Sequence, residues 1–482
     1  MGDNEIVDED RASLTVTSLQ EMVIGQAWAA VSSGDTGAGP TRPAPVELTG
    51  DPGQLPSRFA VEDVAVAGVS AALLAATALC RQRGTDVGAV RVDRGHVAGA
   101  VRSERYFAVK GHPAGAGFAP LSRFWRSADG WVRTHANYPW HRRALVHAMG
   151  TSEDPEAVAS ALEKLSGEEI EDRVFAAGGI AAAVRTLAVW HAHPQGRALA
   201  AEPLISHRST GSGAPRSRGP SDVPLADVRV LDLTRVIAGP VCTRFLGALG
   251  AQVVRLDPPG HRDMAAGAAA DTLVGKRSSF LDIGTPVGAA VLEELLDEAD
   301  VVVGGYRPGS LDRFGLDEES LTARHPGIVA VYLDAWGHSG PWSDRRGFDS
   351  VVQAPTGIAM GEARRGDEPG ALPCQILDHG TGYLAAAAMD GLRRQWAEGG
   401  TVIRRLSLAR TALWLTSIGT QPDDGAAVPA TEPDPPPPWL VELESADGPV
   451  TAVSPPGTLG DRPLRWPSPV TGYGTDPARW ST

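Results

Sequence analysis

The feature that most constrains the fold is an alternation of short apolar strands and helices after residue 225. Strand-length apolar runs occur at VRVLDL, QVVRLD, DVVVGGY and IVAVYLD, and helix-length segments such as PVGAAVLEELLDEA separate them. Strands this apolar are typical of sheets buried on both faces, and a helix between successive strands makes neighbouring strands parallel. We therefore predict an α/β fold with a doubly wound parallel sheet and a smaller, mostly helical domain elsewhere in the chain.

Length and composition limit the number of domains and the class of protein. A chain of 482 residues is too long for one ordinary core. A formal charge of −14 argues against a dedicated nucleic-acid binder, although it leaves room for a local basic pocket. The three cysteines are widely spaced and odd in number, which fits a reducing cytoplasm with no disulfide framework and no metal motif.

Neither a targeting signal nor a membrane segment is predicted. The start, MGDNEIVDED, is acidic where a secretory signal is basic and then apolar. The segment Val64 to Cys80 has about the minimum spanning length, but it is dominated by alanine and includes Gly68 and Ser70, so we expect a buried helix. We predict a cytoplasmic protein without a membrane or nucleic-acid partner and without a bound metal.

Changes in composition divide the chain into five parts. Residues 1–57 are polar and become rich in Pro and Gly, so they are interpreted as an extension and linker. Residues 58–207 carry apolar residues at helical spacing, and 208–224 form a Ser/Gly/Pro-rich linker. Residues 225–420 hold the alternating pattern, and 421–482 form a Pro-rich C-terminal segment.

An internal repeat links the second and fourth parts. A stretch beginning DVAVAGVSAALLAAT and a stretch beginning LDHGTGYLAAAA each contain a glycine, an Ala-rich helix, paired basic residues, a turn, a strand and a helix. When Gly68 is aligned with Gly382, Val64 falls opposite Asp378. Only the second copy therefore has a carboxylate at this place.

Asp378, in ILDHGTGYLAAA, is the candidate catalytic residue. A helix that starts beside an aspartate supplies positive potential and N–H donors, which favour the ionised carboxylate. Gly380 and Gly382 remove side-chain bulk, so we expect a ligand and backbone donors to approach each other here. From the residues alone, a helix cap and a nucleophile are both open readings.

The loop TRVIAGP follows a predicted strand and precedes a helix. Such a loop places Arg235 and backbone N–H groups at the carboxyl edge of a sheet, where α/β proteins bind ligands. The chain has neither a GxGxxG fingerprint nor a GxxxxGK[ST] loop, so a nicotinamide cofactor and ATP hydrolysis have no support. A phosphate-binding loop and a plain strand–helix connection remain equally open.

These motifs together resemble family III CoA-transferases, the CaiB/BaiF family. VLDLTRVIAGPVCTRFLGALGAQVVRLDPPG, GKRSSFLDI, ADVVVGGYRPGSLDRFGLDEESL, GFDSVVQAPTG and LDHGTGYLAA occur in the family's order and spacing, over about residues 228–400. The resemblance implies that 225–420 are a Rossmann-like CoA-binding catalytic domain. Residues 58–207 resemble the later part of such proteins, so small-domain-like sequence here precedes the nucleotide-fold half, and 421–482 resemble the closing return segment.

The resemblance also implies an activity and a set of site residues. An aspartate at the position of Asp378 attacks an acyl-CoA thioester and forms a covalent aspartyl anhydride, and the CoA then passes to a free carboxylic acid without ATP. The implied partners are acyl-CoA, a carboxylic acid acceptor and a second copy of the chain in a homodimer, and no cofactor is tightly bound. Residues that match CoA-contacting positions are Arg235, Val236, Ile237, Ala238, Lys276, Tyr306 and Arg313, while Gly305 stands where many members have asparagine.

Two alternative functions remain open. An α-methylacyl-CoA racemase of the same fold needs a histidine near the position of Phe348, which cannot act as an acid or base, although His338 is close in sequence. A CoA-binding protein without catalysis is favoured by the changed order of parts and by Gly305. His191 and His193 lack further ligands at metal spacing and are predicted to be surface residues.

Overall fold

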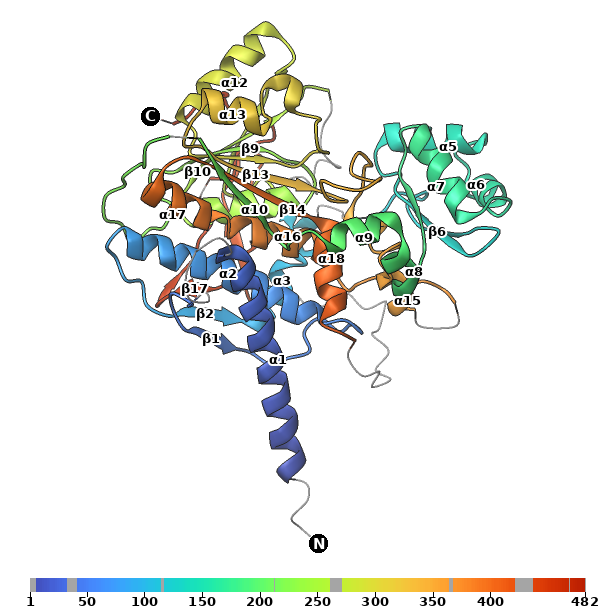
Figure 1. Cartoon of the computed structure of the whole chain (residues 1–482), viewed down its shortest axis with the longest axis horizontal. Coiled ribbons are helices and arrows are strands. Elements are labelled where there is room, and N and C mark those ends of the chain that lie inside the picture. The colour runs from blue at the N-terminus through green and yellow to red at the C-terminus, as the bar shows by residue number, and fades with distance from the viewer. Residues whose placement is uncertain are drawn as a thin grey trace.

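The computed structural model describes residues 6–32, 41–113, 117–211, 213–260, 271–363, 367–420, 437–467 and 469–481. It is a mixed α/β protein, as predicted, and its largest sheet has seven strands in the order β11-β10-β9-β12-β13-β14-β8 (Figure 1). All neighbouring pairs from β11 to β14 are parallel, and β8 joins the edge antiparallel. The strands are β8 (Ser206–Thr210), β9 (Arg229–Leu233), β10 (Gln252–Asp257), β11 (Arg277–Phe280), β12 (Val301–Gly304), β13 (Val329–Asp334) and β14 (Thr401–Ser407).

Both faces of this sheet are buried by helices, because successive side chains of a strand point to opposite faces. In β9, Val230 packs into the core that contains α10 (Ala238–Ala248), α16 (Ile376–Ala386) and α17 (Met389–Glu398). Its neighbour Leu231 packs on the other side, against α12 (Pro286–Glu298) and α13 (Glu318–Arg324). The continuous apolar runs in the sequence therefore reflect strands covered on both sides.

The two helices of the internal repeat pack against each other. α2 (Val61–Gln82) lies between α16 and α1 (Ile6–Ser32), whose residues Val23, Ile24 and Ala27 are buried in the same core. A Cβ atom at Gly68 would lie 3.3 Å from the Cβ of Tyr383, so the missing side chain lets the helices approach closely. By length and composition α2 passes as a membrane span, with a mean hydropathy of 1.9, but 89% of that window is buried inside the protein.

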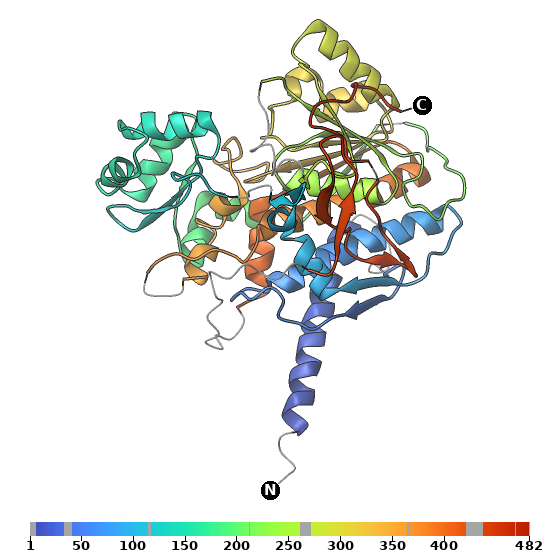
Figure 2. The same ribbon diagram turned by 180° about the vertical axis from the view of Figure 1, so that it is seen from behind.

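The segment 58–207, predicted as one small-domain-like part, is divided between two cores. Its beginning, through α3 (Arg94–Ala100) and α4 (Ser103–Tyr106), belongs to the main body. A separate apolar core that includes Leu121, Trp125 and Val174 forms a smaller unit to one side, which Figure 2 shows from behind. That unit contains β5 (Phe124–Arg126), β6 (Trp131–Thr134), β7 (Ala181–Ala183), α5 (Pro139–Met149), α6 (Pro155–Leu162) and α7 (Gly167–Ala176), and α8 (Leu187–Ala192) and α9 (Pro194–Ala200) follow it.

The C-terminal segment completes two small sheets begun by the first part of the chain. β15 (Leu440–Leu443) and β16 (Val450–Val453) form a sheet with β3 (Ala108–Val109) and β4 (His112–Pro113). β17 (Thr458–Leu459) and β18 (Arg462–Pro463) form another with β1 (Val46–Thr49) and β2 (Val90–Asp93). The predicted extension and linker at 1–57 thus contains α1 and β1, whereas 421–436 of the Pro-rich segment lie outside the described residues.

Candidate functional site

A cleft of about 550 Å³ lies at the carboxyl edge of the parallel sheet. Residues at or just after the ends of five parallel strands line it, which is where open α/β sheets bind ligands. These residues are Leu233, Asp257, Gly305, Asp334 and Leu408. Tyr138, Trp140 and His141 of the smaller unit line the cleft as well, so it lies between the two cores.

The loop after β9 contributes three of the predicted CoA-contacting residues to this cleft. Arg235, Val236 and Ala238 line it, whereas Ile237 is buried at the N-cap of α10 and does not. Val236 has φ = +70°, a left-handed conformation that strongly disfavours a β-branched residue. Such strain persists only where the surrounding structure holds it, and it is frequent at binding sites.

Two of the remaining three predicted contacts also reach the cleft. Tyr306 and Arg313 line it, but Lys276 is fully buried and donates from Nζ to Oδ2 of Asp232 at 2.8 Å. Burial lowers the pKa of Lys276 to about 8, against the opposing effect of Asp232. The lysine predicted to contact CoA phosphates thus lies in the protein interior, because its partner is a carboxylate on strand β9 rather than a ligand.

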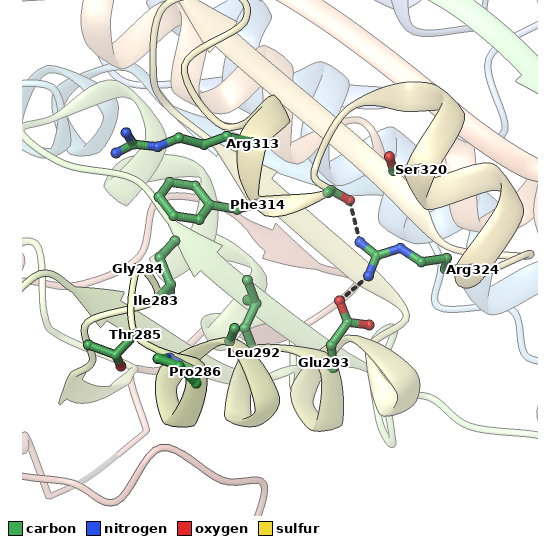
Figure 3. Close-up of a pocket in the computed structure, with 12 residues that line it drawn as sticks. Ile283, Gly284, Thr285, Pro286, Leu292, Glu293, Arg313, Phe314, Ser320 and Arg324 are labelled. Carbon is green, nitrogen blue, oxygen red and sulfur yellow. Dashed lines mark hydrogen bonds and ion pairs between the residues drawn. The ribbon is translucent and has the colours of Figure 1, made fainter.

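A second hollow of about 710 Å³ adjoins the cleft (Figure 3). It lies between the start of α12 and the turn η1 (Asp312–Phe314), and it shares Ile283, Gly284, Arg313 and Phe314 with the cleft. Arg324 on its wall pairs with Glu293 and donates to the carbonyl of Gly315 at 2.9 Å. The shared residues make the two hollows neighbouring parts of one elongated site.

Asp378 lines the cleft, but it does not cap its helix. The N-cap of α16 is Gln375, and Asp378 is the third residue of the first turn. The first-turn N–H groups have no acceptor within the helix and are instead bound by Asp349. Its Oδ2 accepts from the backbone N–H of Leu377 at 2.8 Å and of Asp378 at 3.1 Å. The helix terminus that we expected Asp378 to use is therefore occupied by another carboxylate.

This arrangement reverses the expected ionisation of Asp378. Burial raises its pKa well above the ordinary value, and the nearby charges of Asp349 and Glu104 raise it further. The prediction that the helix terminus favours the anion was wrong for Asp378, because that stabilisation goes to Asp349. Burial raises the pKa of Asp349 to about 6, although the bonds from Gln353 and from the helix N–H groups lower it.

Glu104 reaches the site from the first part of the chain, on the short helix α4. Its Oε2 lies 3.3 Å from Nε2 of His379, the residue after Asp378. Burial alone would raise the pKa of Glu104, but the hydrogen bond and the charge of His379 lower it overall. Two further carboxylates thus lie near enough to the candidate nucleophile to raise its pKa.

The glycines after Asp378 serve helix packing. A Cβ at Gly382 would lie 2.5 Å from the carbonyl oxygen of Ala238, so only glycine allows α16 to lie this close to α10. A Cβ at Gly380 would face Val64 and Thr411. The expected approach of a ligand over these glycines is therefore wrong, because both positions are covered by other helices.

The position at which a racemase would need a histidine is occupied by Phe348. Phe348 lines the cleft, and His338 pairs through Nδ1 with Oδ2 of Asp334 at 2.9 Å without lining the cleft itself. Two histidines that the sequence did not suggest, His135 and His141, pack around Phe348 instead. Within the described ranges, no group of three or more His, Cys, Asp or Glu residues could hold a metal ion.

Asp349 and Glu104 are the site residues that sequence reasoning missed. The sequence indicated Asp349 only weakly, through its place after Phe348 in the motif GFDSVVQ. In the structure it begins the short helix α14 (Asp349–Val352). Glu104 carried none, because 275 positions separate it from His379 and only the folded chain brings the two together.

Comparison with known proteins agrees with the motifs. Residues 225–433 match the model of CoA-transferase family III. This part of the chain is therefore a CoA-transferase family III domain, which confirms the resemblance seen in the sequence, and it contains Asp378 and the loop at Arg235.

Curated relatives share this domain. Succinyl-CoA–D-citramalate CoA-transferase of Chloroflexus aurantiacus is 36% identical over 146 residues, which are 28% of this chain and 36% of that protein. A probable fatty acyl-CoA transferase of Mycobacterium tuberculosis is 33% identical over 34% of this chain and 45% of its own length. Human succinyl-CoA:glutarate CoA-transferase is 33% identical over 41% of this chain and 48% of its own length. The chain thus spans less than half the length of these relatives.

Solved structures were compared as well. A crystal structure of the Mycobacterium tuberculosis protein is 32% identical over 40% of this chain and 56% of that chain, with a TM-score of 0.38.

Proposed function

We propose that this protein is a CoA-transferase that moves CoA from an acyl-CoA to a free carboxylic acid through a covalent intermediate on Asp378. The observation that carries the proposal is a buried carboxylate in a cleft at the carboxyl edge of the sheet, within a family III domain. Relatives with the names of CoA-transferases for citramalate and glutarate support the reaction class.

The proposed chemistry needs only the two substrates and the side chain. An oxygen of ionised Asp378 attacks the thioester carbonyl carbon, the carbon–sulfur bond breaks, and CoA leaves as a thiolate. The product on the enzyme is a mixed anhydride of Asp378 and the acyl group. The thiolate then attacks the aspartyl carbonyl and releases the donor acid, and the acceptor carboxylate repeats these steps in reverse, so bonds broken and formed balance without ATP.

The raised pKa of Asp378 fits such a role. A carboxylate destabilised by burial and by two neighbouring carboxylates is a stronger nucleophile once it is ionised than a well-solvated one. Conversion to a neutral anhydride removes one of three clustered negative charges. The surroundings therefore favour the acyl–enzyme over the free carboxylate, which helps the first step.

Substrate CoA is proposed to occupy the cleft and the adjoining hollow without a tightly bound cofactor. Arg235, Val236, Ala238, Tyr306 and Arg313 are proposed contacts, and the guanidinium groups suit phosphate oxygens. Lys276 and Ile237 are not included, since neither lines the cleft.

We also interpret the large sheet as the doubly wound, Rossmann-like sheet of the family, and we propose a cytoplasmic homodimer.

Trapping the intermediate tests this proposal. Incubation with a panel of acyl-CoAs followed by hydroxylamine and mass analysis is expected to give a hydroxamate on the Asp378 peptide alone. Asp378→Asn is expected to lose both the adduct and CoA exchange while it still melts cooperatively, because an amide is neutral like the protonated acid that burial favours. An unmodified Asp378 peptide across the panel, or exchange by the folded variant, would contradict covalent catalysis.

A further inference from the structure

Three aromatic rings form a continuous wall of the cleft beside the candidate nucleophile. Tyr138 and Trp140 stack with centroids 4.7 Å apart and an interplanar angle of 19°. Tyr138 and Phe348 are also near-parallel, with centroids 6.1 Å apart and an angle of 27°. All three rings line the cleft, and they come from two separate cores of the chain. We call these three residues the aromatic wall.

Two histidines that are uncharged at neutral pH pack against the wall, and one of them, His141, also lines the cleft. His135 stacks on Phe348 with centroids 3.9 Å apart, and His141 meets the same ring edge-on at 6.0 Å. Burial lowers the pKa of His135 to about 3 and, together with the charges of Arg346 and Arg235, lowers that of His141 to about 4. The rings thus pack on neutral imidazoles, and the guanidinium carbon of Arg235 lies 5.8 Å from the centroid of Tyr138.

The wall is connected to Asp378 through Phe348, and both residues line the cleft. Phe348 directly precedes Asp349, whose carboxylate is 3.1 Å from the backbone nitrogen of Asp378. Arg313 and Phe314, by contrast, lie where the cleft joins the second hollow. In CoA the thioester and the adenine are separated by a long pantetheine arm, so a ligand that reacts at Asp378 brings its acyl group, not its base, to the wall.

We propose, on the basis of the function proposed above, that the aromatic wall is the acyl subsite and selects acids with an aromatic body over short dicarboxylic acids. A planar ring in the acyl group can stack on Tyr138, Trp140 or Phe348, and an aromatic pair is stabilised beyond the area it buries. A short dicarboxylic acid has no ring to stack and gains none of this contact.

A series of acyl-CoAs tests the assignment. With the wild-type protein, kcat/KM for benzoyl-CoA and phenylacetyl-CoA is expected to exceed that for succinyl-CoA and acetyl-CoA at least 10-fold, which is about 1.4 kcal/mol of discrimination. Trp140→Ala and Phe348→Leu are expected to lower the ratio of the aromatic values to the acetyl-CoA value about 10-fold. Trp131→Ala is the matched control, since Trp131 stacks with Arg126 in the smaller unit and does not line the cleft.

Two results would overturn the subsite. If the ring variants lose kcat/KM equally for every acyl-CoA and lose affinity for free CoA to the same extent, the rings bind the nucleotide. If the wild-type protein prefers succinyl-CoA, the subsite takes dicarboxylates. Calorimetric affinities of wild-type protein for phenylacetyl-CoA and acetyl-CoA give a readout that needs no turnover. If no acyl adduct forms on Asp378 but phenylacetyl-CoA still binds more tightly than acetyl-CoA, only covalent catalysis is contradicted. If the adduct forms but both acyl-CoAs have equal affinities and rates, only the acyl subsite is contradicted.

Discussion

Asp378 combines two requirements that oppose each other at the scale of a single residue. A nucleophilic carboxylate has to be ionised, yet burial and the charges of Asp349 and Glu104 favour its protonated form. Asp349 also fixes the first turn of α16 through two backbone N–H groups, and Gln353 donates to its other oxygen. The residue that fixes the turn holding Asp378 is thus the same residue that makes the ionisation of Asp378 harder.

Asp349→Asn separates these two effects. The amide oxygen can still accept the N–H groups of Leu377 and Asp378, but the negative charge is gone. Because the charge of Asp349 raises the pKa of Asp378, we expect the rate of acyl–enzyme formation, which rises with pH as Asp378 ionises, to begin its rise at lower pH in the variant. The pH profile of single-turnover adduct formation measures this.

Two comparisons separate orientation from ionisation at this site. Asp349→Ala removes the acceptor as well and is expected to lower the limiting rate about 10-fold or more. A profile for Asp349→Asn that coincides with wild type, or moves toward higher pH, would mean that the charge of Asp349 does not act on Asp378.

Val236 has a positive φ that is uncommon for a residue with a side chain. A β-branched residue at φ = +70° stores strain of about 1–3 kcal/mol, and glycine adopts this conformation freely. Val236→Gly is therefore expected to melt at the same temperature or higher, while its affinity for CoA falls several-fold because the loop is less fixed. Scanning calorimetry and titration calorimetry measure the two effects, and lower stability with unchanged affinity would contradict a strained binding loop.

At the scale of elements, the contact between α16 and α10 sets the position of the proposed nucleophile, Asp378. Gly382→Ala would place a Cβ 2.5 Å from the carbonyl oxygen of Ala238 and 2.9 Å from Cβ of Val241. Overpacking of this kind costs about 1–3 kcal/mol. We expect a lower melting temperature and a slower reaction, because Ala238 and Asp378 line the same cleft.

Gly380→Ala is the matched control on the same helix. Its Cβ would meet Val64 at 3.5 Å and Thr411 at 3.6 Å, which are ordinary contacts. Glycine in a helix interior is about 1 kcal/mol less favourable than alanine, so this variant is expected to be as stable as wild type or more stable. Equal melting temperatures for the two variants would show that the close approach of α16 and α10 is not required.

The elements themselves were largely predictable. The strands after residue 225 and the helices between them appear where the apolar periodicity places them, and the Ala-rich stretch predicted at Val64–Cys80 is the buried helix α2. Asp378 was placed correctly beside a helix start, but its exact place in the first turn was not. Capping depends on which side chain reaches the N–H groups, and here that side chain comes from Asp349.

At the scale of the whole molecule, the first and second halves of the chain share one core. α2 contributes apolar residues such as Leu73 and Leu74 to the core that contains α10 and α16, and strands of the C-terminal segment pair with β2 and β3. Glu104 adds a charge from the first half to a site on the second. The order of parts along the chain therefore does not separate them in space.

Expression of the chain in two pieces tests this dependence. A fragment of residues 208–482 would expose the faces of α16 and α10 that α2 covers, so we expect it to be insoluble alone. Co-expression with residues 1–207 is expected to yield a soluble complex that purifies as one species and regains CoA exchange. A soluble, active 208–482 fragment would show that the first half is dispensable.

Light scattering on the intact chain tests the proposed homodimer.

The sequence by itself determined the α/β class and the family of residues 225–433, because apolar periodicity and motif order are local properties of the chain, and it made Asp378 the candidate nucleophile. Tertiary structure alone decided the surroundings of Asp378: the carboxylate of Asp349 on its helix, Glu104 across the chain, and the aromatic wall at Phe348. It also placed Lys276 in the interior. The physical reason is that burial, charge proximity and ring stacking depend on distances between residues far apart in sequence, which local patterns do not specify.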